Sequence, residues 1–147
     1  VHPQWGPRAA RDLQAGELLG VYAGEQRVQT DAITWDAFRR NAYFFSLQKG
    51  PDQLIIDPWV HGNHLMFIND FHADPLGTHP APSPDAEREQ NTAFLTANWR
   101  GWPYVLVVTM RAVDKGEELL ADYNEDYWRR RKDQEAEWHG LWQVVCE

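Results

Sequence analysis

Asn69 and Asp70 stand at the end of an apolar run, within the segment HLMFINDFHA of residues 64–73. Residues 65–68 predict a short buried strand, and Asn and Asp side chains commonly occupy the turn that follows a strand. An amide also offers both hydrogen-bond donors and an acceptor. Asn69 therefore has two interpretations: it terminates the strand, or it places its amide against a ligand.

Residues 61–72 carry three histidines that could bind a metal ion together with Asp70. Asp70 and two of the histidines His61, His64 and His72 would supply one carboxylate and two imidazoles, the ligand type of non-haem iron oxygenases. Such ligands must converge on one face, whereas on a strand His61 and His64 would point to opposite faces. We therefore predict no metal site in this chain and keep an iron oxygenase as an alternative.

A second chemically suggestive segment, GEELLADYNEDYW, covers residues 116–128 and contains Tyr123. A phenol has one hydrogen-bond donor and an acceptor oxygen, so it can orient an amine without becoming charged. Taken alone, Tyr123 is explained equally well as an aromatic residue of the core. The residue type by itself leaves both interpretations open.

β-Strand patterns dominate the elements that must position these side chains. Five apolar segments bounded by turn residues are predicted to be strands, at residues 18–22, 43–47, 53–57, 91–98 and 104–113. The last of them is so rich in β-branched residues that we place it in the centre of a sheet. A hairpin turn at residues 49–52 is expected to join the second and third strands.

Helical spacing is confined to two segments, and the fold class we predict is mainly β with short helices. Apolar residues recur at helical spacing over residues 30–40, after a Thr or Asp cap, and the aromatic, charged C-terminal stretch predicts a helix over residues 127–142. Residues 75–90 are rich in proline and poor in apolar side chains, which is typical of an exposed loop.

The composition indicates a folded, acidic chain. A length of 147 residues suits one domain, and eight Trp among 43% hydrophobic residues is unlike a disordered chain. With 14 Lys and Arg against 22 Asp and Glu, the formal charge is −8, which argues against direct nucleic-acid binding and favours either a basic partner or simple solubility. Because Cys146 is the one cysteine, these residues can form neither an internal disulfide nor a thiolate zinc cluster.

Four segments, taken in order, resemble the motifs of SET-domain protein lysine methyltransferases. Each motif alone is weak, but four in sequence at family-like spacing are specific, and together they span residues 4–128. The segments are WGPRAARDLQAGELLGVYAGE, IIDPWVHGNHLMFIND, QNTAFL and RAVDKGEELLADYNEDYW.

The resemblance implies the fold of that family, in which small curved β-sheets are combined with a C-terminal pseudoknot. We expect residues 1–128 to form the SET-like catalytic domain and residues 129–147 to form a C-terminal helical extension that packs on it. The family's usual cysteine-rich zinc segment is missing after the catalytic strand. The stretch from Trp128 to Trp142, or a partner, is expected to complete the lysine channel instead.

The resemblance also implies an activity, the transfer of a methyl group from S-adenosylmethionine to a lysine of a basic protein, with a histone as one candidate. The alternative is a catalytically weak or inactive SET-fold module that binds peptide or S-adenosylmethionine. We expect a protein or peptide partner with a lysine, no nucleic acid and no membrane, since no apolar run approaches the roughly 20 residues that span a bilayer. An intracellular location is expected, and a nuclear one if the substrate is a histone; because the chain begins at Val1, it looks trimmed.

For the methyl donor, the resemblance implies contacts from Trp5, Gly6, Asn69 and Asp70. Asn69 aligns with the Asn of the family's Asn-His pair, whose side chain contacts the donor's amino group, and Asp70 stands where the family has His. Two other positions also differ, since Gln4 replaces the first Gly of the family's G-x-G turn and Met66 replaces an Arg.

For catalysis, the resemblance implies Tyr123 and Tyr22, with Tyr22 and Phe94 lining the substrate channel. Methyl transfer is an in-line displacement, so positioning along one axis supplies much of the rate. A phenylalanine at position 94, where a phenol would restrict the channel, favours di- or trimethylation, and Ala121 is small at the other position used for this purpose. Core packing explains Phe94 equally well, and Asn91 is either the family's P-N asparagine or a turn residue.

Overall fold

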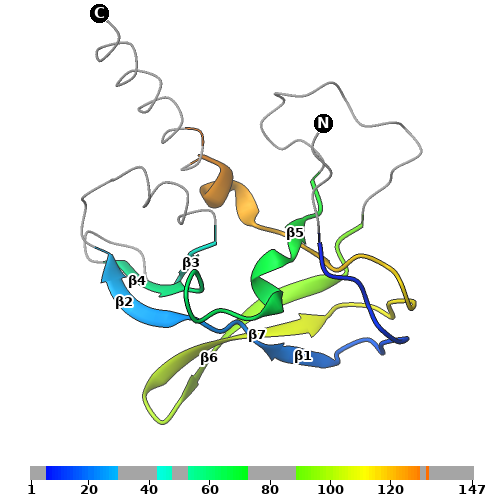
Figure 1. Cartoon of the computed structure of the whole chain (residues 1–147), viewed down its shortest axis with the longest axis horizontal. Helices are drawn as coiled ribbons and strands as arrows, with labels where there is room; N and C mark the ends of the chain where they lie inside the picture. The colour runs from blue at the N-terminus through cyan, green and yellow to red at the C-terminus, as the bar shows by residue number, and fades with distance from the viewer. Residues whose placement is uncertain (1–5, 30–42, 48–52, 73–88, 130–131, 133–147) are drawn as a thin grey trace, which may run out of the picture.

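The structure is a computed structural model that describes residues 6–29, 43–47, 53–72, 89–129 and 132 (Figure 1). The predicted helix over residues 30–40, the turn at 49–52 and most of the loop at 75–90 lie outside these residues, as do Trp5 and most of the C-terminal extension. In chain order, the elements are β1 (Leu18–Val21), β2 (Glu25–Gln29), β3 (Phe45–Ser46), β4 (Gln53–Asp57), η1 (His64–Phe67), β5 (Asn69–Asp70), β6 (Thr92–Trp99), β7 (Trp102–Thr109) and β8 (Leu120–Ala121).

The largest sheet is antiparallel and has the strand order β1-β7-β6. The prediction that the β-branched strand lies in the centre is confirmed, since β7 pairs on both edges. Its Val105 and Val107 side chains are fully buried in the core. The hairpin between β6 and β7 turns at Arg100 and Gly101, whose φ angles of 51° and 82° give the left-handed pair that a tight two-residue hairpin requires.

A second antiparallel sheet has the order β2-β4-β3. The predicted strands at 43–47 and 53–57 are confirmed as partners, with Phe45 opposite Ile56 and Ser46 opposite Ile55. Ile55 and Ile56 are both buried, so the central strand of this small sheet also contributes to the core. The sheet carries Phe45 towards the cavity that is described below.

The predicted strand at residues 65–68 is wrong, because residues 64–67 form the 3₁₀-helix η1. The Asn63 side chain accepts a hydrogen bond from the Leu65 N–H at 3.2 Å and thereby caps the turn. Periodicity cannot separate a helical turn from a strand in so short an apolar run. Only Ile68, which follows the helix, is fully buried, and Asn69 begins strand β5 instead of terminating one.

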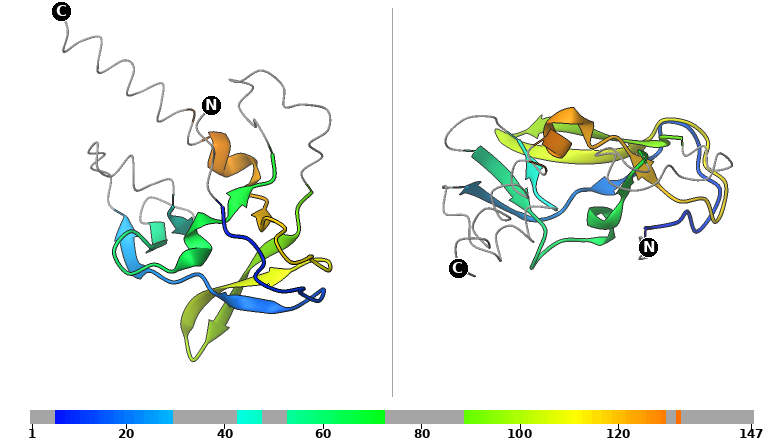
Figure 2. Two further views of the ribbon diagram at one scale, coloured as in Figure 1. Left: turned by 45° about the vertical axis from the view of Figure 1, so that its right-hand side comes forward. Right: turned by 90° about the horizontal axis from the view of Figure 1, so that it is seen from above.

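Strands β5 and β8 form a parallel pair that joins two distant segments of the chain. Asn69 lies opposite Leu120 and Asp70 opposite Ala121. In both views of Figure 2, the green segment of η1 and β5 lies beside the orange chain at β8. The amide of the fully buried Asn91 holds the same stretch, since its Oδ1 accepts from the Leu120 N–H at 2.8 Å.

The N-terminal residues run beside the chain that leads into β8. The Leu119 N–H donates to the Pro7 carbonyl at 2.9 Å, and isolated bridges pair Arg8 with Glu118 and Leu13 with Val113. This pairing brings Gly6 next to Glu118. No helix among the described residues is long and apolar enough to cross a membrane.

A short helix at residues 124–129 follows β8 and precedes the extension. It begins at Asn124, three residues before the predicted start at residue 127. Asn124 Oδ1 accepts a hydrogen bond from the Tyr127 N–H at 3.2 Å. Asn is a favoured residue at a helix start for this reason. With eight short strands and little helix in the described residues, the prediction of a mainly β fold is confirmed.

Candidate active site

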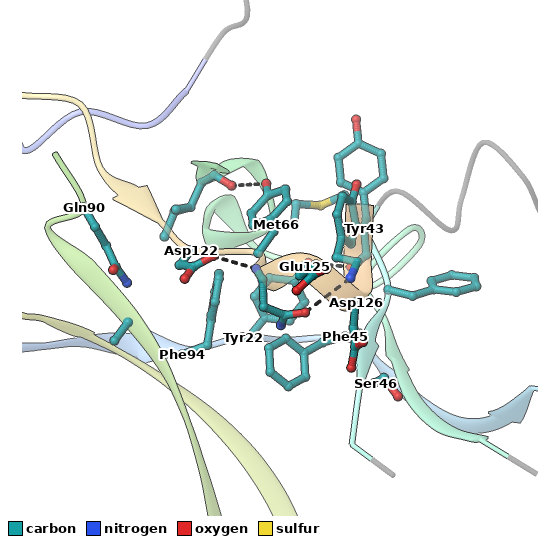
Figure 3. A pocket seen from close by; sticks show the side chains of 16 residues that line it. Tyr22, Tyr43, Phe45, Ser46, Met66, Gln90, Phe94, Asp122, Glu125 and Asp126 are labelled. Carbon is teal, nitrogen blue, oxygen red and sulfur yellow. Dashed lines mark hydrogen bonds between the residues drawn. The ribbon is translucent and has the colours of Figure 1, made fainter. Parts of the chain in front are cut away.

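A cavity of about 580 Å³ is bordered by strands β3 and β6, by η1 and by the helix at residues 124–129. Tyr22, Phe45, Met66, Phe94 and the residues around Tyr123 contribute to its wall (Figure 3). Three of the predicted site residues, Tyr22, Phe94 and Tyr123, are thus brought together from three separate segments. Aromatic rings and polar side chains share the lining, and a concave site with both is the usual place for a small molecule or a side chain to bind.

Three aromatic rings form one wall of the cavity. The Tyr22 and Phe94 rings meet edge to face, with centroids 5.7 Å apart and an interplanar angle of 89°. Phe45 packs against both, at 6.0 Å from Tyr22 and 5.5 Å from Phe94. Phe45 was not predicted as a site residue, because only the pairing of β3 with β4 brings it here.

The Tyr22 phenol is buried, with 6% of the residue exposed, and its hydroxyl donates a hydrogen bond to the Tyr43 carbonyl at 2.5 Å. Burial raises the pKa of Tyr22 far above its ordinary value, and the neighbouring Tyr127, Tyr43 and Asp57 raise it further. The phenol is therefore neutral at physiological pH. It can accept or donate a hydrogen bond but cannot serve as a base.

Tyr123 is held at both ends by the segment that contains β5. Its hydroxyl donates to the Ile68 carbonyl, and its main-chain N–H donates to Asp70 Oδ2 at 2.6 Å. Burial is the largest cause that raises the Tyr123 pKa, followed by the electrostatic influence of Tyr127 and Tyr22. Like Tyr22, it remains a neutral phenol. Its ring also packs against Tyr127, with centroids 4.8 Å apart.

A second cluster, separate from the cavity lining, is polar and consists of Gly6, Asn69 and Glu118. Asn69 directly follows Ile68 in the chain. Asn69 Nδ2 donates to Glu118 Oε1 at 2.8 Å. A Cβ atom at position 6 would lie 2.4 Å from Glu118 Oε1 and 2.6 Å from Asn69 Nδ2, so any larger residue would displace the ends of these two side chains. Gly6 and Asn69, both predicted donor contacts, therefore lie together, whereas Trp5 is outside the described residues.

Glu118 and Tyr127 are candidate site residues that the sequence did not single out. Glu118 is the second glutamate of the G-E-E-L segment, and the pairing of residues 7–13 with 113–119 was needed to place it. Tyr127 lies four residues after Tyr123, which is the helical spacing for contact on one face. That spacing was visible in the sequence.

The Asp70 carboxylate is engaged within the protein. It is buried and accepts hydrogen bonds from Tyr123, Trp128 and His72. A main-chain contact between Asp70 and the methyl donor stays a prediction. The position where the family has His is thus occupied by an acceptor that faces Tyr123.

The histidines do not assemble the metal site that their spacing suggested. His61 Nδ1 lies 2.7 Å from Glu25 Oε1, and His72 Nδ1 lies 2.7 Å from Asp70 Oδ1. Within the described part of the chain, one group of three potential ligands converges within 4.8 Å, and it consists of Asp70, His72 and Asp122. It includes neither His61 nor His64, and both Asp70 oxygens already accept hydrogen bonds.

Acidic side chains line the cavity where the helix at residues 124–129 approaches it. Asp122, Glu125 and Asp126 contribute to the lining together with the aromatic rings. Asp126 also pairs with Arg129 at 2.7 Å. A cation is attracted both by carboxylates and by aromatic faces, so this combination suits a positively charged or amine-bearing side chain.

Comparisons with known proteins give the same assignment. A family model described as the SET domain matches residues 4–124. Histone-lysine N-methyltransferase EHMT1 of Homo sapiens is 28% identical over 125 residues, covering 84% of this chain and 8% of that protein. Histone-lysine N-methyltransferase trithorax of Drosophila virilis is 27% identical over 122 residues, covering 80% of this chain and 3% of that protein, so this chain spans a small part of either relative. The match over residues 4–124 confirms the resemblance seen in the sequence, and the chain belongs to the SET domain family.

Proposed function

We propose that this chain is a protein-lysine N-methyltransferase that transfers a methyl group from S-adenosylmethionine to a lysine of a basic protein. The observation that carries the proposal is the convergence of the neutral phenols Tyr22 and Tyr123 with Phe94 in one cavity. The names of the relatives support a histone as the substrate class. A histone substrate would place the enzyme's action in the nucleus.

The cluster of Gly6, Asn69 and Glu118 fits the methyl donor. The absence of a side chain at Gly6 lets the polar ends of Asn69 and Glu118 lie directly against its backbone. Asn69 and Glu118 supply an amide oxygen and a carboxylate, which are acceptors for an ammonium group. When bound, S-adenosylmethionine supplies a methyl group on a positively charged sulfur. Holding it is the task of these three residues and of Trp5.

The substrate lysine has to release its proton to solvent water before it can act as a nucleophile. Free lysine has a pKa of about 10.4, and an apolar environment lowers it by disfavouring the charged form. The rings of Tyr22, Phe45 and Phe94 provide such an environment, while Asp122 and Glu125 first attract the ammonium. Because both phenols remain neutral, their role is to orient the amine rather than to remove its proton.

The number of methyl groups transferred is proposed to be two or three. Phe94 lines the cavity and packs on Tyr22. Because its ring carries no hydroxyl, it neither takes the space of a phenol oxygen nor binds a water at that point. The small side chain of Ala121 is fully buried in β8, next in the chain to the lining residue Asp122. The residue type at position 94 is what supports room for a methylated amine.

The proposal is tested by transfer of a labelled methyl group from S-adenosylmethionine to a panel of histones and other basic proteins. We expect label on lysine residues of at least one basic substrate and none on a matched protein whose lysines are blocked by acetylation. Binding of S-adenosylmethionine without any transfer would contradict an enzyme and support a SET-fold binding module. Absence of both binding and transfer would contradict both functions.

A further inference from the structure

Asp70 is a buried carboxylate that accepts hydrogen bonds from two residues of the proposed active-site region, Tyr123 and Trp128, and from His72. The residue is 6% exposed. Its Oδ2 accepts from the Tyr123 N–H at 2.6 Å and from the Trp128 indole N–H at 3.3 Å. Its Oδ1 accepts from the His72 main-chain N–H at 2.7 Å and lies 2.7 Å from His72 Nδ1.

These hydrogen bonds determine how Tyr123 is presented to the cavity. The tyrosine is anchored at its main chain by Asp70 and at its hydroxyl by Ile68, two residues earlier. Ile68 directly precedes the two-residue strand β5 and Asp70 ends it, so the position of this strand sets the direction of the phenol. Loss of the Asp70 hydrogen bond would leave the hydroxyl contact and the packing of the ring on Tyr127 and Trp128 to hold the residue.

Asp70 also fixes the helix at residues 124–129 over the cavity. The Trp128 ring stacks on Tyr123, with centroids 6.1 Å apart and an interplanar angle of 19°, and meets Tyr127 edge to face at 5.0 Å. Tyr127 lines the cavity. The indole hydrogen bond to Asp70 therefore connects this aromatic group to β5.

We propose that Asp70 is a positioning residue for methyl transfer, which orients Tyr123 through its main chain and holds the helix at residues 124–129 on the cavity through Trp128. This proposal rests on the proposed function. A carboxylate suits the role, since the main-chain N–H groups of His72 and Tyr123 and the indole N–H of Trp128 are donors and both carboxylate oxygens accept. Asparagine would replace one acceptor oxygen by an N–H₂ group that faces a donor.

The test compares Asp70→Asn with Trp128→Phe and with the matched control Asp57→Asn. Asp57 is also 6% exposed and also accepts a hydrogen bond from the main-chain N–H two residues later, that of Trp59, at 3.0 Å. We expect Asp70→Asn to lower kcat by about tenfold or more, since small misplacements of reacting groups are costly. KM for the peptide and Kd for S-adenosylmethionine should change little. Trp128→Phe should lower kcat in the same direction by less.

The control separates positioning from loss of stability. Asp57→Asn removes a comparable buried carboxylate and its ion pair with Arg27, so its unfolding midpoint should fall. Asp57 influences Tyr22 only electrostatically, so kcat below that midpoint should fall far less than in Asp70→Asn. Equal kcat losses in Asp57→Asn and Asp70→Asn, or an unchanged kcat in Asp70→Asn, would overturn the proposal.

If the wild type transfers no methyl group, the proposed function is refuted. The contact between Asp70 and Tyr123 is still tested, by amide hydrogen exchange measured by NMR. Asp70→Asn should abolish protection of the Tyr123 amide and shift the ring signals of Tyr123 and Trp128, and Asp57→Asn should change neither. Unchanged protection of Tyr123 in Asp70→Asn would refute the positioning role.

Discussion

The Tyr123 hydroxyl donates a hydrogen bond to the main-chain carbonyl of Ile68, which lies 55 positions earlier in the chain. Ile68 is followed directly by Asn69, whose amide contacts Glu118 beside Gly6. One short segment therefore links the phenol proposed for catalysis with the polar cluster proposed for the methyl donor. The parallel pairing of β5 with β8 holds the two together.

Asn69→Ala should weaken binding of S-adenosylmethionine by about 1–3 kcal/mol, because a buried charged amine would lose its acceptor. Gly6→Ala should also weaken binding, since the added Cβ would push the Asn69 and Glu118 side chains apart. The two effects should not add, since the double variant loses one shared contact. Isothermal titration calorimetry of the four proteins measures this; unchanged affinity in Asn69→Ala would contradict the placement of Asn69.

Phe94→Tyr should shift the product from di- or trimethyllysine towards monomethyllysine. The new hydroxyl would project into the cavity beside Tyr22 and Phe45 and would occupy space needed by a methylated amine. Mass spectrometry of the peptide product at long reaction times reports the methyl count. Tyr104→Phe, on β7 and away from the cavity lining, is the control; an unchanged product distribution in Phe94→Tyr would show that Phe94 does not restrict the channel.

Asn91→Ala should lower the free energy of unfolding by about 3 kcal/mol, since it leaves several buried groups without partners. The Asn91 side chain donates to the Glu118 carbonyl at 2.8 Å and to Glu117 Oε1 at 3.1 Å, and it accepts from the Leu120 N–H. Urea denaturation measures the change. The exposed Asn98→Ala should change stability by less than about 0.5 kcal/mol, and an equally small effect at Asn91 would contradict its role in holding β8.

Stability should fall as the pH rises above 10, because the folded chain keeps protons that the unfolded chain releases. The pKa values of Tyr22 and Tyr123 are raised by burial, whereas an unfolded tyrosine titrates near about 10. Above that pH, each buried phenol should cost up to about 1.4 kcal/mol of unfolding free energy per pH unit. Urea denaturation at pH 9 and pH 11 tests this; Tyr22→Phe or Tyr123→Phe should reduce the slope, and an unaltered slope in both would contradict burial of the phenols.

Local patterns predicted most of the strands. The β-branched run at residues 104–113 was predicted to be central and forms the middle strand β7, and the segments at 43–47 and 53–57 pair as expected. The apolar run at 65–68 was misread, because a capped 3₁₀ turn and a short strand have the same composition. That error matters for the site, since it reverses Asn69 from the end of a strand to the start of one.

The candidate site depended on long-range contacts that local patterns cannot supply. Nothing in the spacing of Tyr22, Phe94 and Tyr123 predicts that they meet, and only the family resemblance suggested it. Glu118 and Phe45 were missed because each reaches its place through pairing with a distant segment. Asp70 was expected to contact the methyl donor through its main chain, whereas the contacts of its side chain to Tyr123 and Trp128 follow from the β5–β8 pair.

The most direct test of the central claim is single-turnover methyl transfer by wild type and Tyr123→Phe, with saturating S-adenosylmethionine and lysine peptide. Phenylalanine keeps the ring and its packing on Tyr127 but removes the hydroxyl that donates to Ile68 and that we propose orients the amine. We predict a fall in the rate of about 100-fold with donor binding retained. An undiminished rate in Tyr123→Phe would contradict the assignment of this cavity as the methyl-transfer site.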